Sequence, residues 1–99
     1  MKIAEWISNT YQRTTVYGTL IRPKVMCADG FKISVQASRM HYCTPRATLA
    51  EGADYKALEL GFASHKDELI EDYCEGLIYP YVPVEFVDKL IEKHGGIMV

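Results

Sequence analysis

The alternation of apolar and polar residues is clearest over residues 24–38, where it predicts a β-hairpin. Alternate apolar positions of the second strand would face a core: Phe31, Ile33, Val35 and Ala37. The intervening polar positions would face solvent: Lys32, Ser34, Gln36 and Ser38. Asp29-Gly30 lies between the two strands, and this dipeptide tolerates the positive φ angles of a type I′ turn.

Three other segments have the composition of strands. Residues 13–23 are rich in β-branched and aromatic residues and predict a strand interrupted at Gly18. Residues 55–62 alternate, and the predicted buried positions are Leu58, Leu60 and Phe62. Residues 76–83 predict a short extended segment, and Pro80 places it at a sheet edge because proline cannot donate to a ladder.

The strongest helical pattern covers residues 83–96. Its apolar face is predicted to contain Val84, Val87, Leu90, Ile91 and His94. Pro83 suits a first helical turn because the N–H group that it lacks needs no partner there. Gly95 and Gly96 would end the helix because they adopt the left-handed conformation easily.

Two weaker patterns predict further helices. Residues 2–11 have near-helical apolar spacing, and residues 65–75 follow Ser64, whose hydroxyl could cap a first turn. The buried stripe of the second segment would consist of Leu69, Ile70 and Tyr73. Together these elements predict a single α+β domain over residues 1–99, in which a small antiparallel sheet with a central Asp-Gly hairpin is packed by two to three helices.

Composition narrows the possible functions. The chain has 99 residues, a net charge of −2 and a pI of about 5.9, which argue against a general duplex-DNA binder. No apolar run approaches the roughly 20 residues of a membrane helix. The first ten residues lack the apolar centre of a signal peptide. We therefore expect a cytoplasmic protein that binds neither membranes nor duplex DNA.

Three cysteines, Cys27, Cys43 and Cys74, are a poor basis for a disulfide framework. They could join His41 around zinc, although no C-x-x-C motif supports a metal site. Cys43 and His41 could also form a nucleophile and base, but no hydrolase or protease signature surrounds them. We expect no catalytic residue, metal or cofactor, and chemistry that depends on Cys43 remains the minor alternative.

Residues 39–46 read "RMHYCTPR" and combine groups suited to binding a phosphate-bearing ligand. Arg39 and Arg46 could hold phosphate through paired hydrogen bonds. Tyr42 could stack on a nucleobase. The remaining candidate ligand-binding residues would supply hydrogen bonds: Gln36, His41, Thr44 and, from a facing subunit, His94. Each of these side chains could instead be an ordinary solvated or packed residue, and the 39–46 segment a structural anchor.

Seven tyrosines are a large number for a chain of this length. Tyrosine is favoured where a surface is both apolar and wet, as in pockets and protein interfaces. A small sheet with an exposed edge also tends to pair with a copy of itself. These two features predict a homo-oligomer.

Part of the sequence resembles a family of small proteins carried by phages and prophages. The resemblance lies in the segments "VMCADGFKISVQASRMHYCTPR", "ALELGF" and "YPYVPVEFVDKLIEKHGGI", which cover about half of the chain. In that family a cysteine–DGF–SVQA–YC–[ST]PR block precedes a valine–proline helix that ends in HGG. The resemblance implies a viral protein that acts in the host cytoplasm.

A phage setting implies an anti-defence role, and one such route resembles the Thoeris anti-defence sponges. Those proteins assemble as oligomers and sequester cyclic nucleotide signals without cutting them. The chain is thus predicted to be a sponge for a small nucleotide-like ligand. The alternative is an anti-CRISPR-like inhibitor that binds a host defence complex, with acidic residues that imitate nucleic-acid charge: Glu68, Glu71, Asp72 and Glu75.

Overall fold

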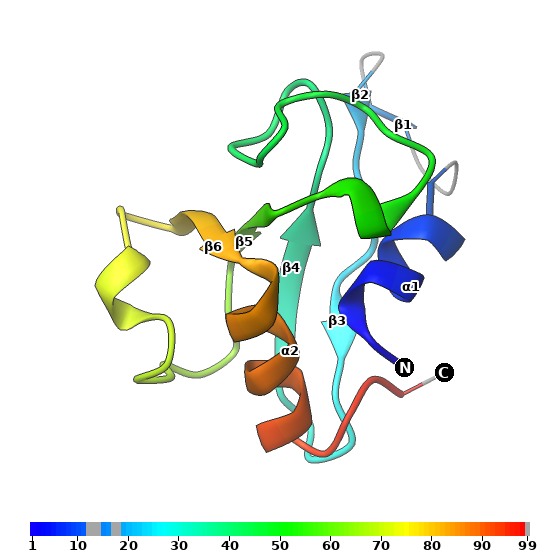
Figure 1. The fold of residues 1–99 in the computed structure, drawn as a ribbon. Helices are drawn as coiled ribbons and strands as arrows, with labels where there is room; N and C mark the ends of the chain where they lie inside the picture. Colours follow the sequence, from blue (N-terminus) through cyan, green and yellow to red (C-terminus); the bar gives the residue numbers. More distant parts are fainter. Residues whose placement is uncertain (12–14, 17–18, 99) are drawn as a thin grey trace.

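A four-stranded antiparallel sheet lies at the centre of the computed structural model, which describes residues 1–11, 15–16 and 19–98 (Figure 1). The strands follow one another in the order β3 (Val25–Met26), β4 (Lys32–Gln36), β5 (Ala57–Gly61) and β6 (Ile78–Pro83). Helices α1 (Ile3–Asn9) and α2 (Val84–Lys93) pack on this sheet. The predicted α+β class with its antiparallel sheet is therefore confirmed.

Two short strands near the N-terminus form a separate pair. β1 (Thr15–Val16) runs antiparallel to β2 (Thr19–Leu20). The sequence predicted a single interrupted strand over residues 13–23, and the described part of that segment forms two paired strands instead. The predicted interruption at Gly18 lies outside the described residues, as do residues 13, 14 and 17.

The turn between β3 and β4 is a three-residue loop, so the predicted type I′ turn is wrong. Cys27 N–H donates to Phe31 O at 2.8 Å, and Gly30 N–H donates to Cys27 O at 3.0 Å. Gly30 has a φ of 96°, whereas Asp29 keeps a negative φ. Asp29 Oδ1 accepts the Phe31 N–H at 2.9 Å, and this side-chain bond favours a type I turn followed by a left-handed glycine.

The buried face of β4 matches the prediction, but the opposite face does not. The predicted apolar positions are buried: Phe31, Ile33, Val35 and Ala37. Gln36 and Ser38 are also buried, although the alternation placed them toward solvent. The main chain of Arg22 covers Gln36 because its N–H donates to Gln36 Oε1 and its carbonyl oxygen accepts from Gln36 Nε2, both at 2.8 Å.

Strand β5 buries Leu58 and Leu60 as predicted, but Phe62 is exposed. The chain leaves the strand at Phe62 with a φ of 52°, a left-handed conformation that turns the ring away from the core. The edge position predicted for residues 76–83 is confirmed, because β6 is the last strand of the sheet.

The helix predicted over residues 65–75 is wrong. This segment consists of turns and a single 3₁₀ turn, η2 (Glu71–Tyr73). Ser64 Oγ accepts the N–H of Lys32 at 2.9 Å and so supports β4 where a helix cap was expected. Asp67 Oδ1 accepts the N–H of Leu69 at 2.9 Å, a local bond that competes with helix formation.

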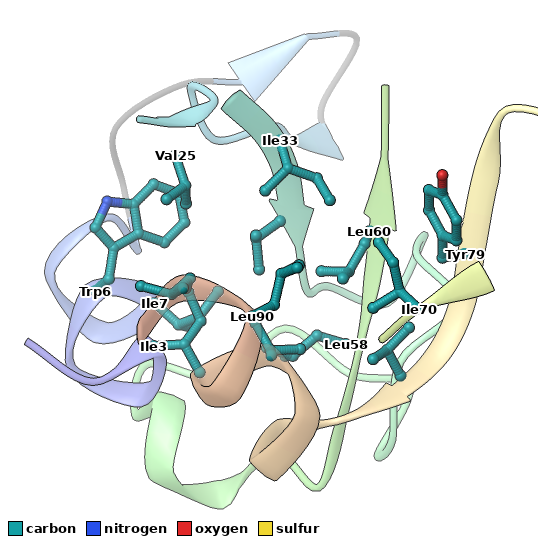
Figure 2. Packing of buried hydrophobic residues seen from close by; sticks show 14 of the residues in the cluster. Ile3, Trp6, Ile7, Val25, Ile33, Leu58, Leu60, Ile70, Tyr79 and Leu90 are labelled. Carbon is teal, nitrogen blue, oxygen red and sulfur yellow. The ribbon is translucent and has the colours of Figure 1, made fainter. Parts of the chain in front are cut away.

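The two α-helices form as expected and enclose the core with the sheet. Figure 2 shows α1 residues Ile3 and Ile7 beside Leu90 of α2 and Leu58 of β5. Helix α2 begins after Pro83, and Gly95 and Gly96 end it with φ angles of 93° and 91°. A second 3₁₀ turn, η1 (Gly52–Asp54), contacts α1. Within the described part of the chain, no helix has the length and apolar character needed to cross a membrane.

Candidate functional site

The loop that follows β4 folds around the buried side chain of Ser38. Ser38 Oγ accepts the N–H of Met40 at 3.1 Å and lies 2.6 Å from His41 Nδ1. The carbonyl oxygen of Ser38 accepts the His41 N–H at 3.1 Å and the Cys43 thiol at 3.3 Å. These bonds fix the backbone of residues 38–43. They therefore also fix the backbone positions from which the side chains of the loop project.

Cys43 is buried inside this loop. Burial raises the pKa of its thiol, which therefore stays protonated at neutral pH. The thiol donates to the carbonyl oxygens of Ser38 and Pro45, at 3.3 and 3.4 Å. Burial also lowers the pKa of His41, whose Nδ1 is engaged by Ser38. These features suit a structural thiol better than a nucleophile.

Tyr42, Arg46 and Tyr81 form an exposed aromatic and cationic group. The guanidinium carbon of Arg46 lies 4.9 Å from the centre of the Tyr42 ring. The Tyr42 and Tyr81 rings are 6.0 Å apart and tilted by 52°. Both tyrosines are accessible, with exposed fractions of 41% and 46%.

Hydrogen bonds from the backbone N–H groups of Tyr42 and Tyr81 fix the positions of these two tyrosines. Tyr81 N–H donates to Tyr42 O at 3.1 Å, and Tyr42 N–H donates to Glu59 Oε2 at 2.8 Å. The loop and two strands of the sheet therefore meet at this point, although their residues are far apart in the sequence.

A bulge in β6 turns Tyr81 outward. Leu58 pairs with Val82 and Leu60 with Tyr79, so two β6 residues lie opposite one β5 residue. Tyr81 in this bulge has a φ of 55°, a conformation that disfavours a side chain by roughly 1 kcal/mol. Bulges often redirect a side chain next to a functional site.

A shallow depression of about 440 Å³ lies beside the tyrosines. We call it the tyrosine depression, and its lining residues are Tyr42, Glu75, Ile78, Pro80 and Tyr81. Its volume falls within the range of roughly 300–1,000 Å³ seen for small-molecule sites. The combination of two phenol rings, a carboxylate and the Arg46 guanidinium offers stacking together with both signs of charge.

The structure brings together only some of the residues predicted to bind ligand. Tyr42 lines the tyrosine depression, and Arg46 packs on the Tyr42 ring. Arg39 and Thr44 are exposed on the same loop but do not line the depression. His41 is half-buried against Ser38.

Gln36 and His94 do not line the tyrosine depression. Gln36 is 5% exposed, and its amide bonds the Arg22 main chain and the Ser34 hydroxyl, so it is not available to a ligand. His94 follows α2, whose C-terminal end lies at the opposite end of the molecule from the 39–50 loop (Figure 1). Neither residue lines the tyrosine depression of its own chain, and a contribution of His94 from a facing subunit stays a prediction.

His94 lies between two carboxylates. Its Nδ1 is 2.6 Å from Asp29 Oδ2, its Nε2 is 2.8 Å from Asp67 Oδ2, and its ring stacks on Phe31 at 4.0 Å. Lys93 also donates to Asp67, at 3.1 Å. Since an ionised carboxylate only accepts hydrogen bonds, both ring nitrogens must carry hydrogen and the side chain is an imidazolium.

The pKa values of this cluster agree with that assignment. Burial lowers the pKa of His94, but the hydrogen bonds to Asp29 and Asp67 outweigh burial and raise it. The Phe31 N–H and then His94 lower the pKa of Asp29. Burial raises the pKa of Asp67, but its bonds from the Leu69 N–H, His94 and Lys93 lower it overall. With both nitrogens occupied, His94 stabilises the fold and cannot act as a base.

The zinc alternative finds no support in the described part of the chain. No group of three or more histidine, cysteine, aspartate or glutamate side chains there could hold a metal ion. Cys27 is buried in the core, whereas Cys74 is exposed.

Sequence reasoning missed the residues that β6 and the preceding turn supply: Glu75, Ile78, Pro80 and Tyr81. A proline inside a strand often marks a bulge, so Pro80 was the available signal. Comparisons with protein-family models, curated proteins and solved structures find no match to this chain. The chemistry of the tyrosine depression is therefore the basis for a functional proposal.

Proposed function

We propose that this protein is a non-catalytic binding protein that captures a nucleotide at the tyrosine depression. The observation that carries the proposal is the Arg46 guanidinium held 4.9 Å from the centre of the Tyr42 ring, which itself lines the depression. A cation beside an aromatic wall matches a ligand that has an anionic group next to a flat ring.

Arg46 is the candidate for the phosphate. A guanidinium binds phosphate oxygens through two parallel hydrogen bonds, and Arg46 is exposed to an incoming ligand. Its contact with Tyr42 contributes roughly 0.5–1 kcal/mol at an exposed position. This contact also restricts the arginine before binding, which lowers the entropy lost when a ligand arrives.

Tyr42 and Tyr81 are the candidates for the base. Their rings are tilted by 52° and so do not cover each other as a parallel stack would. Stacking of a base on an aromatic side chain contributes roughly 1–3 kcal/mol. The strained backbone of Tyr81 supports this role, because such conformations concentrate where a side chain is used.

The resemblance to phage-carried proteins extends the proposal. In that setting the bound nucleotide would be an immune signal, and the protein would be a homo-oligomeric sponge in the host cytoplasm. The buried, protonated thiol of Cys43 supports capture without cleavage. The resemblance to the Thoeris anti-defence sponges supports a cyclic nucleotide.

Calorimetry with a panel of cyclic and linear nucleotides tests the proposal. We expect one member of the panel to bind and to raise the melting temperature, because a ligand of the folded state stabilises it by mass action. The ligand should be recovered chemically intact after the protein is denatured by heat. If no nucleotide in the panel binds, or the ligand is altered, the proposal is wrong.

Replacing Arg46, the cation next to the depression, tests the proposed phosphate contact most sharply. Arg46→Ala should reduce nucleotide affinity by about tenfold or more, since it removes a charge-assisted pair of hydrogen bonds. Arg39→Ala is the matched control, because it removes the same charge from the same loop, whereas among the described residues it is Arg46 that packs on the Tyr42 ring. Equal losses in both variants would indicate general attraction of an anion and no defined site.

A second candidate, a protein-binding inhibitor, is supported by exposed apolar side chains next to the depression. Leu77 and Phe62 are 71% and 53% exposed and are neighbours, since Phe62 N–H donates to Leu77 O at 3.2 Å. Exposed apolar side chains that form a contiguous patch are typical of a protein interface. The acidic residues 68–75 support this candidate less, because they do not form the helix surface that the sequence predicted. Capture of one host complex that is lost in Leu77→Asp would favour this function.

A further inference from the structure

We infer that the tyrosine depression selects guanine over the other bases and that Glu75 is the residue that reads the base. This inference rests on the proposed function, because it names the class of nucleotide that the same site takes. It depends on Glu75, the one charged residue in the lining of the depression, which has no role in the proposed function.

Glu75 supplies the only carboxylate among the five residues that line the depression. The other four are two tyrosines, a proline and an isoleucine, none of which carries a charge at neutral pH. Within the described residues, the ion pairs of this protein involve Lys93 and His94 with Asp29 and Asp67. In that part of the chain the Glu75 side chain also makes no hydrogen bond, so its oxygens are open to a ligand.

A carboxylate in a base-binding site requires hydrogen-bond donors from the ligand, because both of its oxygens only accept. The Watson–Crick edge of guanine offers two adjacent donors, the ring N1–H and the 2-amino group. Adenine and cytosine each place a ring-nitrogen acceptor beside their amino group, and uracil places its N–H between two carbonyl oxygens. A carboxylate therefore pairs with guanine through two bonds and meets a lone pair on each of the other bases.

The opposite charges at the site exclude the simplest alternative ligand, an organic cation. A cationic amine would be attracted to Glu75 and the tyrosine rings, but Arg46 on the Tyr42 ring would repel it. A ligand that has an anionic group at one end and a donor-rich ring at the other satisfies both charges. A guanine nucleotide has this arrangement.

Calorimetry on the intact chain with guanosine, inosine and adenosine 5′-monophosphates tests the inference, with cyclic di-guanylate and cyclic di-adenylate as a second pair. Inosine monophosphate is informative because it keeps the N1–H and lacks the 2-amino group. We expect affinity to fall in the order guanosine, inosine, adenosine, by roughly tenfold or more for each lost charge-assisted bond.

Variants separate base reading from phosphate binding. Glu75→Gln should reduce the guanine-to-adenine ratio severalfold, whereas Arg46→Ala should weaken both nucleotides by the same factor. Asp72→Asn is the matched control, since it makes the same change of charge on the same segment outside the depression and should leave the ratio unchanged.

The outcomes distinguish this inference from the proposed function. If guanine and adenine nucleotides bind equally, or the ratio survives Glu75→Gln, the reading role of Glu75 is overturned while nucleotide capture stands. If no nucleotide binds, the proposed function itself fails. If Glu75→Gln does not fold, the three monophosphates still test the guanine preference in the unaltered protein, and equal affinities for them would overturn the inference.

Discussion

The side chain of Glu59 fixes the position of Tyr42 in the tyrosine depression. Glu59 is half-buried, lies opposite the β6 bulge and accepts the Tyr42 N–H at 2.8 Å. It does not line the depression, so it acts on a ligand through the position of Tyr42. We regard Glu59 as a positioning residue, and it can be separated from a general structural role because an amide oxygen can also accept a hydrogen bond.

Substitutions at Glu59 test this role. Glu59→Ala should weaken nucleotide binding severalfold, because Tyr42 loses the acceptor that fixes its main chain. Glu59→Gln should restore most of the affinity, since the amide oxygen takes the same bond. If calorimetry shows that Glu59→Gln binds as poorly as Glu59→Ala, the charge of Glu59 matters and its positioning role is wrong.

Part of the site could be read from the sequence at this scale. Tyr42 and Arg46 are four residues apart in one loop, and their chemical types pointed to an anionic aromatic ligand. Tyr81 and Glu75 come close to them only through the pairing of β5 with β6, which no local pattern encodes. Gln36 was predicted to face solvent but is buried, because its partner, the main chain of Arg22, lies 14 residues away and no local pattern shows it.

Among the helices and strands, local sequence patterns correctly predicted those elements whose conformation depends mainly on neighbouring residues in the sequence. The alternation in β4 and β5 and the helical spacing in α2 were sufficient to identify those elements. The helix predicted over residues 65–75 does not form, because polar groups in and next to this segment form hydrogen bonds with residues that are distant in the sequence. Ser64 bonds Lys32, 32 residues away, and Asp67 bonds His94, 27 residues away. A helix over residues 65–75 would break these hydrogen bonds.

The His94 cluster connects three elements and gives them a predictable pH dependence. It joins the β3–β4 turn through Asp29, the 65–70 segment through Asp67 and the end of α2 through His94 itself. The folded pKa of His94 is raised, so its contribution is complete below the unfolded value of about 6.5 and is lost as the pH rises through the folded value. The pKa values of Asp29 and Asp67 are lowered, so their contributions are complete above about pH 4 and are lost as the pH falls through the folded values.

Urea unfolding at several pH values tests this cluster. The unaltered protein should lose stability relative to His94→Gln as the pH rises from 6 to 9, because the imidazolium gives up one of its two donors. His65→Gln is the control, since His65 is exposed and lies 2.9 Å from the hydroxyl of Ser64. A difference between the unaltered protein and His94→Gln that does not change with pH would contradict the imidazolium assignment.

Across the whole molecule, one buried cation connects the N-terminal helix to the sheet. The guanidinium of Arg22 donates to Thr10 Oγ1 at 2.8 Å, to Ala37 O at 2.7 Å and to Ile7 O at 3.2 Å. Burial lowers its pKa, yet three acceptors and the negative end of α1 compensate for the lost water. This single side chain joins the end of α1 to the end of β4.

Removing that cation should destabilise the whole fold. Arg22→Met removes the guanidinium donor from the Ala37 carbonyl oxygen and the Thr10 hydroxyl oxygen, and each such loss costs roughly 1–3 kcal/mol. Ile7 O keeps its bonds from the Thr10 N–H and hydroxyl. We expect the free energy of unfolding to fall by about 3 kcal/mol, a large part of the roughly 5–15 kcal/mol of a small domain. A loss below about 1 kcal/mol in urea unfolding would show that water replaces the guanidinium and that the cation is dispensable.

The proposed binding surface for a nucleotide is the tyrosine depression together with Arg46. Backbone amide NMR during titration with guanosine 5′-monophosphate tests it most directly, because it locates binding without altering the protein. We expect progressive shifts at Tyr42, Arg46, Glu75 and Tyr81, with little change at the three residues of the His94 cluster, Asp29, Asp67 and His94. Shifts centred on His94, or no shifts at any residue with any nucleotide of the panel, would contradict it.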